Sequence, residues 1–219
     1  MKKICLIAVS AIAVAGASAT VKLPAYIGDN MVLQQNTEIK IPGVTAPGAK
    51  VTVTPSWGKA VKTTADAQGN FTVTLATPAA GGPFSIVFDD GDVLTVDNIL
   101  SGEVWLCSGQ SNMEMPLAGW GQVKDFQTEI AMANNPNVRL LQVHKNISTV
   151  PLDTVEFNGG GWVECTSGTV PGFSACAYFY ARELADKLGV PVGVIDTTWG
   201  GTPVEAWTPE EYMQIVPGF

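Results

Sequence analysis

Apolar and polar residues alternate in short runs along the first hundred residues. Val51–Thr54 and Phe71–Leu75 both alternate, which is typical of strands with one buried face. The runs Ser85–Phe88 and Val93–Val96 are separated by an Asp-Gly-Asp turn signal, which predicts a hairpin. Short strands at this spacing predict a small antiparallel β-sandwich over residues 20–100, with a core of its own.

From residue 101 the pattern changes to that of a parallel α/β sheet. Apolar residues at helical spacing predict one helix over residues 124–133 and a second that Ser174 caps. Three apolar runs predict buried strands: Val104–Cys107, Val138–Val143 and Val192–Ile195. Strands alternating with helices predict a parallel sheet with crossover helices. Since such sheets usually have about five or more strands, residues 101–219 are expected to be an incomplete domain.

The first nineteen residues have the features of a secretory signal peptide. Met1-Lys2-Lys3 supplies the positive charge, Ile4–Gly16 the apolar segment and Ala17-Ser18-Ala19 a cleavage site. The alternative is a membrane anchor, but the apolar segment falls short of the roughly 20 residues that a spanning helix needs. We therefore expect export to the periplasm or to the outside of the cell, with a mature chain that begins near Thr20.

Signal cleavage removes Cys5 and leaves three cysteines. Cys165 and Cys176 flank a loop and could pair in an oxidising compartment, although spacing alone does not decide this. Cys107 lies in an apolar strand and is expected to be a buried free thiol. The cysteines lack metal-site spacing and the chain has one histidine, so the sequence predicts neither a zinc site nor another metal site.

Composition narrows the class of partner. The formal net charge is −8, and 46% of the residues are hydrophobic against 15% charged. An acidic chain without a basic tract does not suit nucleic acid or an anionic membrane surface. We therefore expect a folded protein whose partners are neither nucleic acid nor an anionic membrane.

A serine follows the first predicted α/β strand in the segment Ser108–Met115. At the carboxyl end of a parallel strand, Ser111 could expose its hydroxyl and use its own backbone N–H to stabilise an oxyanion. The alternative is an ordinary capping turn, because a lone Gly-x-Ser is a weak signal.

A second segment, Asp196–Trp207, follows the third predicted strand and should lie at the same edge of the sheet. Gly200 and Gly201 would let the backbone approach a ligand closely, and their N–H groups could complete an oxyanion hole. The alternative is a plain glycine turn.

Together these segments resemble the SGNH-type hydrolases, specifically the sialate O-acetylesterase family. The resemblance covers most of residues 101–209. It is also carried by these shorter segments: Val138–Leu140, Gly161–Cys165, Gly172–Phe179 and Gly189–Gly193. It implies a flavodoxin-like parallel α/β domain after the β-sandwich, and a serine esterase that needs no cofactor and removes O-acetyl groups from sialic acids or related acetylated sugars.

The resemblance assigns Ser111 as the nucleophile, with backbone N–H groups of Ser111 and of Gly201 or Gly200 as oxyanion donors. Gln110, Asn112 and Trp199 are candidate substrate-binding residues. Two further family motifs, a polar donor and the Asp-x-x-His that supplies the base, have no counterpart in these 219 residues. We therefore expect the chain to be the N-terminal part of a longer enzyme and nearly inactive alone.

Four other residues near the motifs have alternative roles. His144 would have to be the base if the chain acted alone, but no family motif places a catalytic histidine there. Glu114 and Glu205 lie near the two segments but could simply face solvent or cap helices. Trp207, like Trp199, could form a wall of a sugar pocket or belong to the core.

Two other functions fit the same pattern. The chain could be a non-catalytic carbohydrate-binding or structural protein in which the β-sandwich does the work. It could also be an acetyl xylan esterase-type enzyme, since other acetylated sugars need similar chemistry and the fold does not decide between substrates.

Overall fold

The structure, a computed structural model, describes residues 20–121, 123–150, 152 and 154–215. The expected signal peptide, with Cys5, lies outside these residues. The strands are β1 (Val32–Gln34), β2 (Glu38–Val44), β3 (Lys50–Pro55), β4 (Val61–Thr64), β5 (Asn70–Ala76), β6 (Gly81–Asp89), β7 (Val93–Gly109), β8 (Asn134–Val143), β9 (Phe157–Thr166) and β10 (Val192–Thr198). The helices are α1 (Ser111–Glu114), α2 (Phe126–Met132), α3 (Ala175–Leu188), α4 (Glu210–Met213) and the short 3-10 helix η1 (Val204–Trp207).

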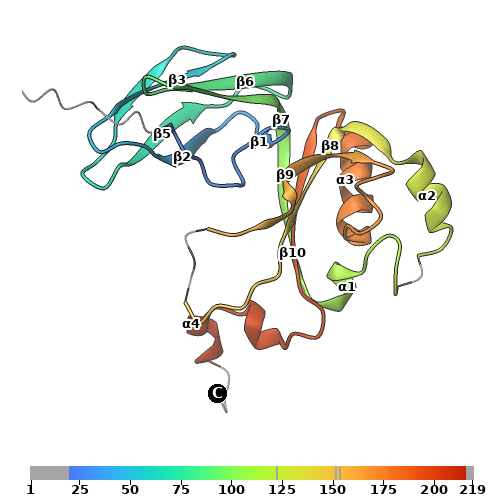
Figure 1. Cartoon of the computed structure of the whole chain (residues 1–219). Helices are drawn as coiled ribbons and strands as arrows, with labels where there is room; N and C mark the ends of the chain where they lie inside the picture. Colours follow the sequence, from blue (N-terminus) through green and yellow to red (C-terminus); the bar gives the residue numbers. More distant parts are fainter. Residues whose placement is uncertain (1–19, 122, 151, 153, 216–219) are drawn as a thin grey trace, which may run out of the picture.

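The N-terminal part is a two-layer sandwich (Figure 1). Strands β2 and β5 pair antiparallel and face a sheet made of β4, β3, β6 and the first half of β7. The alternation of β5 buries Phe71 and Leu75, which belong to the same core cluster as Val53 and Phe88 of the opposite sheet. The predicted sandwich is confirmed, with the difference that β1 pairs parallel to β7.

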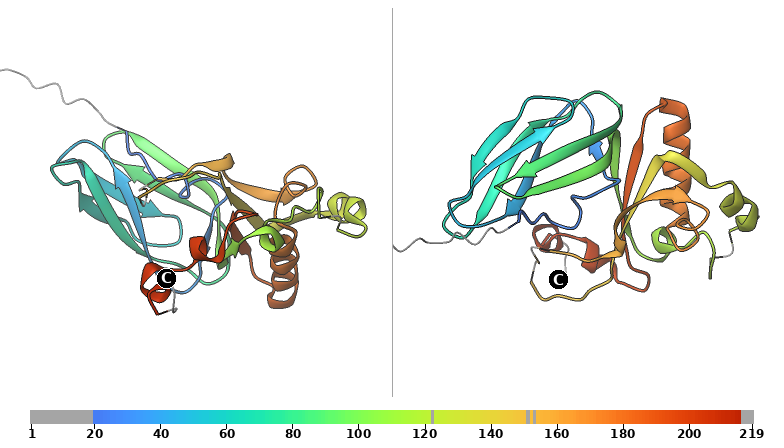
Figure 2. Two further views of the ribbon diagram at one scale, coloured as in Figure 1. Left: turned by 90° about the horizontal axis from the view of Figure 1, so that it is seen from below. Right: turned by 45° about the horizontal axis from the view of Figure 1, so that its top comes forward.

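Strand β7 joins the sandwich to the α/β part. The sequence predicts two strands here, but one strand of 17 residues runs through both and across the expected boundary at residue 100. The polar residues between the two predicted runs fit into the strand because they have partners. Asn98 bonds Asn30 and Glu164, and the Ser101 hydroxyl donates to the carbonyl of Pro78. The large sheet has the order β4-β3-β6-β7-β10-β8-β9, with β1 also paired to β7. Figure 2 shows the sandwich and the α/β part from two further sides.

In the α/β part, β7, β10 and β8 are parallel, and β10 lies between the other two. Helix α3 covers one face of this sheet (Figure 1). Its side chains at helical spacing, Tyr178, Ala181 and Ala185, are buried in a cluster with Val138 and Val194. The predicted parallel α/β arrangement is confirmed.

Strand β9 is the strand of the α/β part that the sequence did not predict, and it pairs antiparallel with β8. Its first half contains Gly159, Gly160 and Gly161, which break the apolar pattern that predicts a strand. Its second half carries Trp162, which is 6% exposed and reaches the core shared with the sandwich. An antiparallel edge strand is therefore added to the predicted parallel strands.

The two halves of the large sheet meet at a buried cation. Arg139 of β8 is 2% exposed. Its guanidinium forms an ion pair with Glu164 at 3.0 Å and bonds Asn30 and Asn98 at 3.3 and 3.4 Å. Since Asn30 precedes β1 and Asn98 lies in β7, this cluster links the sandwich to β8 and β9.

The three cysteines that the structure describes are free thiols. Cys107 is buried, as predicted, and burial, with the nearby Asp196 charge, raises its thiol pKa to about 11. Cys165 is buried and Cys176 is exposed, so the pairing that the sequence left open is not formed.

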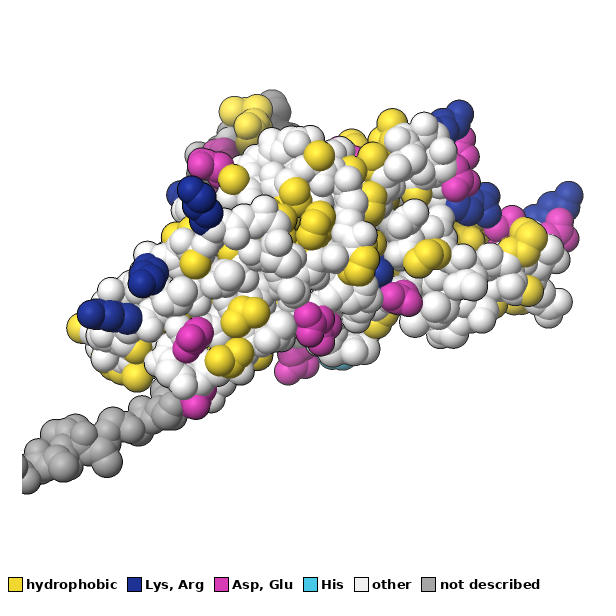
Figure 3. Space-filling model, turned by 90° about the horizontal axis from the view of Figure 1, so that it is seen from above, with side chains coloured by type: hydrophobic (Ala, Val, Ile, Leu, Met, Phe, Trp, Pro, Cys, Tyr) yellow, Lys and Arg dark blue, Asp and Glu magenta, His cyan; other side chains and the backbone are white. Residues whose placement is uncertain are grey.

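Among the described residues, none of the helices has the length and apolar character needed to cross a membrane. On the face drawn in Figure 3, basic side chains stand singly or in small groups among acidic ones.

Candidate active site

The two segments that the sequence singled out lie side by side. Strands β7 and β10 pair in parallel up to Gly109 and Thr198. The pairing continues for one bond beyond the strands, since the backbone N–H of Trp199 donates to the carbonyl of Gly109 at 2.9 Å. Parallel pairing puts both carboxyl ends at one edge of the sheet, so the turns that follow them must meet.

Ser111 is the first residue of α1, and it is partly exposed. The turn before it contains Gly109 at φ +137°, a conformation that favours glycine. The Ser111 hydroxyl donates to the side-chain oxygen of Gln110 at 2.9 Å, and the Ser111 backbone N–H points to the same oxygen at 3.4 Å. Both donors of this serine therefore converge on one neutral oxygen.

Gly200 is packed against Ser111. A Cβ at this glycine would lie 3.4 Å from Cα and 3.5 Å from Cβ of the serine, and 2.6 Å from a carboxylate oxygen of Glu114. The backbone N–H of Gly200 donates to that carboxylate. Gly201 follows at φ +80°, and within the described residues its N–H has no acceptor. Of the two predicted oxyanion donors, Gly201 is thus the one whose N–H is available.

Glu114 does more than face solvent or cap a helix. One of its oxygens accepts the Gly200 N–H, and the other forms an ion pair with Lys145, which follows β8. The Lys145 ammonium lies 5.9 Å from the ring centre of Trp199. Chiefly through Lys145, and also through Gly200, these contacts hold the pKa of Glu114 below its usual range, although partial burial opposes them.

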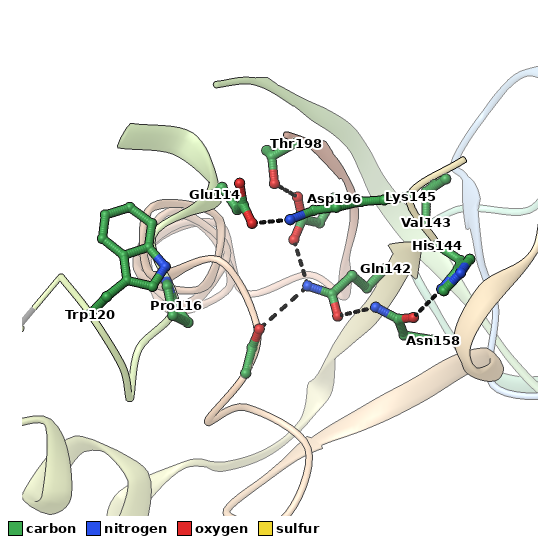
Figure 4. Close-up of a pocket in the computed structure, with 11 residues that line it drawn as sticks. Glu114, Pro116, Trp120, Gln142, Val143, His144, Lys145, Asn158, Asp196 and Thr198 are labelled. Carbon is green, nitrogen blue, oxygen red and sulfur yellow. Dashed lines mark hydrogen bonds and ion pairs between the residues drawn. The ribbon is translucent and has the colours of Figure 1, made fainter. Parts of the chain in front are cut away.

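A cavity of about 340 Å³ opens beside Glu114 and Thr198 (Figure 4). Trp120, which is 61% exposed, forms one wall of it. The other lining residues are mostly polar: Glu114, Gln142, His144, Lys145, Asn158, Asp196 and Thr198. The sequence did not single out Trp120, Gln142, Lys145 or Asn158, because they come from loops and strands far apart in the chain.

A chain of hydrogen bonds runs through this cavity (Figure 4). The buried Asp196 accepts from the hydroxyl of Thr198 at 2.6 Å and from the amide of Gln142 at 3.0 Å. Asn158 donates to Gln142 at 2.8 Å, and its own amide oxygen lies 3.2 Å from Nδ1 of His144. Burial raises the pKa of Asp196, and the hydrogen bonds oppose that shift.

His144 directly follows β8, where the sequence placed it. Its ring contacts Asn158, whereas the Ser111 hydroxyl contacts Gln110. Within the described residues, no hydrogen bond joins this histidine to the serine. The geometry therefore gives His144 no direct access to the proton of Ser111.

The remaining predicted residues are spread around the two turns. Gln110 caps α1, and the carbonyl of Asn112 accepts from the thiol of Cys176. Trp207 donates its indole N–H to the hydroxyl of Thr202 at 2.7 Å. Glu205 lies exposed in η1. Of this set, Gln110 is the one that contacts Ser111.

The described residues contain no cluster of three or more His, Cys, Asp or Glu side chains suited to hold a metal ion.

Comparison with known proteins places the chain in a family. The family described as "Carbohydrate esterase, sialic acid-specific acetylesterase" matches residues 101–217, which is slightly more than half of the chain. The chain belongs to this family. A bacterial Ig domain family matches residues 24–95, which form most of the sandwich.

Individual relatives agree with this assignment. The sialate O-acetylesterases of Pongo abelii and Homo sapiens are both 33% identical over 204 residues, which cover 85% of this chain and 38% of each relative. A crystal structure of a carbohydrate acetylesterase from Xanthomonas citri superposes with a TM-score of 0.80 at 35% identity, over 89% of this chain and 44% of that one. The chain thus spans less than half the length of these relatives.

Proposed function

We propose that this chain is the N-terminal part of an exported carbohydrate O-acetylesterase whose nucleophile is Ser111. One observation carries the proposal. In a member of an acetylesterase family, the serine at the start of α1 packs against Gly200 at the shared carboxyl edge of β7 and β10.

The proposed reaction is acyl transfer through the serine. The Ser111 oxygen attacks the acetyl carbonyl, and the backbone N–H groups of Ser111 and Gly201 donate to the oxyanion that forms. A base takes the proton of the Ser111 hydroxyl and gives it to the sugar oxygen, which leaves as a free hydroxyl group. Water, deprotonated by the same base, then attacks the acetyl-enzyme, which releases acetate and restores the serine hydroxyl. In this structure the Ser111 N–H points to the side-chain oxygen of Gln110, so the substrate carbonyl oxygen takes the place of that oxygen as the acceptor of this N–H. The Ser111 hydroxyl, which also donates to Gln110, turns instead to the base.

A serine needs a base to become nucleophilic. The contacts of Ser111 supply none among the described residues, and His144 is bonded to Asn158 instead. We propose that the base and its orienting carboxylate lie in sequence that these 219 residues do not contain. The length of the relatives, of which the chain covers 38%, leaves room for such a segment.

The polar cavity is the proposed sugar site. Sugars present hydroxyl groups at their edges and C–H groups on their faces, so they suit a pocket that combines planar polar side chains with an aromatic wall. Gln142 and Asn158 supply amides, and the exposed ring of Trp120 supplies the wall. We propose an O-acetylated sugar, sialic acid included, as the substrate class.

Hydrolysis of p-nitrophenyl acetate tests the nucleophile. In the full-length protein, Ser111→Ala should lower kcat by about 10³-fold or more. Ser108→Ala, which changes an exposed serine near the end of β7, should leave kcat unchanged. Equal rates for wild type and Ser111→Ala would overturn the proposal. The 219-residue chain alone should show only background hydrolysis. Robust activity that depends on Ser111 would instead make His144 the base to test.

The proposed export has its own test. It rests on Lys2, Lys3 and the apolar segment up to Gly16. Sequencing the amino terminus of the protein recovered from outside the cytoplasm should give Thr20. An intact Met1 on that protein would overturn cleavage at this site.

A further inference from the structure

The contacts around Glu114 connect the segments that follow all three parallel strands. Glu114 lies in α1, after β7; Lys145 follows β8; Gly200 follows β10. One carboxylate oxygen takes the ammonium of Lys145 and the other takes the N–H of Gly200. A single side chain therefore fixes the relative positions of the segments that form the catalytic edge.

From this geometry we infer that Glu114 is a positioning residue, which holds Gly200 against Ser111 and so leaves the N–H of Gly201 as the second oxyanion donor. The inference rests on the proposed function for its catalytic consequence, but the contact itself does not. The inference also selects Gly201 over Gly200, the two glycines that the sequence left as alternative oxyanion donors.

Space and charge both support this role. The Glu114 side chain is 21% exposed and that of Lys145 is 42% exposed, so water screens the pair only in part. A Cβ at Gly200 would lie 2.6 Å from the carboxylate, so any larger residue at this position would displace the carboxylate from its present place. Since the Gly200 amide is occupied by an anion, it is unavailable to a second anion, the transition-state oxygen.

The Gly201 amide has the opposite character. Its φ of +80° turns the backbone at this point, and its N–H has no acceptor among the described residues. An N–H group that is held in place and left unpaired is what a preorganised oxyanion hole requires. Without Glu114 the turn loses the bond that fixes Gly200, and Gly201 loses its fixed direction.

The contact between the Gly200 N–H and the Glu114 carboxylate can be tested without an activity assay. In ¹H–¹⁵N spectra of the chain, the Gly200 amide proton should shift as the pH falls through the acidic range, because protonation of Glu114 removes the charge that it bonds. Its exchange with solvent should also be slow. Lys145, His144 and Asp196 are the other charged or titratable groups that line this cavity, so variants must identify the source of the shift.

Glu114→Gln should remove the acidic titration of Gly200 while keeping an oxygen acceptor, and Glu114→Ala should also speed its exchange about tenfold or more. Glu205→Gln is the matched control, since Glu205 is exposed in the segment after β10. It should leave both signals unchanged. A Gly200 amide that neither titrates nor changes in Glu114→Ala would overturn the inference, whatever the enzyme activity proves to be.

The catalytic consequence is read in the full-length protein. Glu114→Ala should lower kcat on p-nitrophenyl acetate about 10- to 100-fold with little change in KM, because a displaced donor weakens the transition state and not the bound ester. Glu114→Gln should lie between wild type and Glu114→Ala. A change in KM alone, or loss of activity in proportion to loss of folded protein, would contradict a positioning role. If Ser111→Ala keeps its activity while the Gly200 signals behave as expected, the proposed function fails and the contact stands.

Discussion

The two parts of the molecule that β7 joins depend on contacts of different range. The antiparallel strand pairs of the sandwich join residues that are at most 38 positions apart, as Glu38 and Ala76 are (76 − 38 = 38). At the proposed catalytic edge, where β7, β8 and β10 end, Glu114 accepts a hydrogen bond from Gly200, which lies 86 residues away in the sequence. Near the junction, Arg139 reaches Asn30 across 109 residues. A local alternating pattern therefore builds the first part, whereas the second depends on the order of strands in the sheet.

The difference affects what each part can tolerate. In the sandwich, several apolar side chains pack into the same core cluster. At the proposed catalytic edge, the position of a polar atom depends on one or two contacts. The loss of one such contact changes the direction in which a backbone N–H group points. We therefore expect mutations in the sandwich to change stability most and mutations at the edge to change activity most.

Truncation of a core side chain is expected to have the largest effect on stability. Phe88 of β6 is fully buried, so Phe88→Ala should reduce the free energy of unfolding by about 3–5 kcal/mol. Because β7 and the core cluster, which includes Leu141 and Trp162, continue into the α/β part, thermal unfolding should remain a single transition. Circular dichroism and amide exchange would show this.

A matched variant separates the effect of the cavity that Phe88→Ala leaves in the core from general effects of substitution in the β6–β7 hairpin. Val93 is 64% exposed, so Val93→Ala should change stability by less than about 0.5 kcal/mol. If Phe88→Ala removed protection from the sandwich alone and left that of α3 intact, the two parts would unfold separately. The coupling that we ascribe to β7 would then be wrong.

The sequence predicts features that depend on local patterns better than features that depend on contacts between distant segments. Alternation at Phe71–Leu75 sufficed for the sandwich, and the apolar face of α3 sufficed for its packing. The motifs around Ser111 and Gly200 could be placed at one edge, because parallel strands end together. Lys145 and Trp120 could not be found this way, since nothing local marks a loop residue whose partner lies on another loop. Strand β9 was missed because glycines interrupt its pattern.

The junction between the parts should show an intermediate loss of stability. Arg139→Met keeps the length of the side chain but removes the ion pair to Glu164 and the bonds to Asn30 and Asn98. Because the carboxylate of Glu164 is 45% exposed and can be hydrated, we expect a loss of about 1–3 kcal/mol in urea unfolding.

Arg182→Met is the control for this variant. Arg182 of α3 forms its ion pair with Glu129 at the surface, with 37% of its own side chain exposed. Such pairs contribute about 0–1 kcal/mol. Equal losses for the two variants would mean that the buried cluster does not join the two parts more strongly than a surface pair does.

The smallest expected loss of stability is also the one that reaches the catalytic edge. The buried hydroxyl of Ser174 caps α3 by accepting from the N–H of Ala177 at 3.1 Å, and it donates to the carbonyl of Met113 at 2.5 Å. Ser174→Ala removes both contacts, and we expect a loss of about 1–2 kcal/mol. Met113 lies in α1, two residues after Ser111, so the change frees the helix that carries the proposed nucleophile.

The kinetic effect of Ser174→Ala should therefore exceed what its stability suggests. In the full-length protein at a temperature where it is fully folded, kcat on p-nitrophenyl acetate should fall severalfold, because α1 is held less firmly against Gly200. Ser167→Ala, an exposed serine in the turn after β9, should change neither quantity. An unchanged kcat in Ser174→Ala would show that Glu114 and the pairing of β7 with β10 suffice to position α1. Helix α3 would then stabilise the fold without tuning the site.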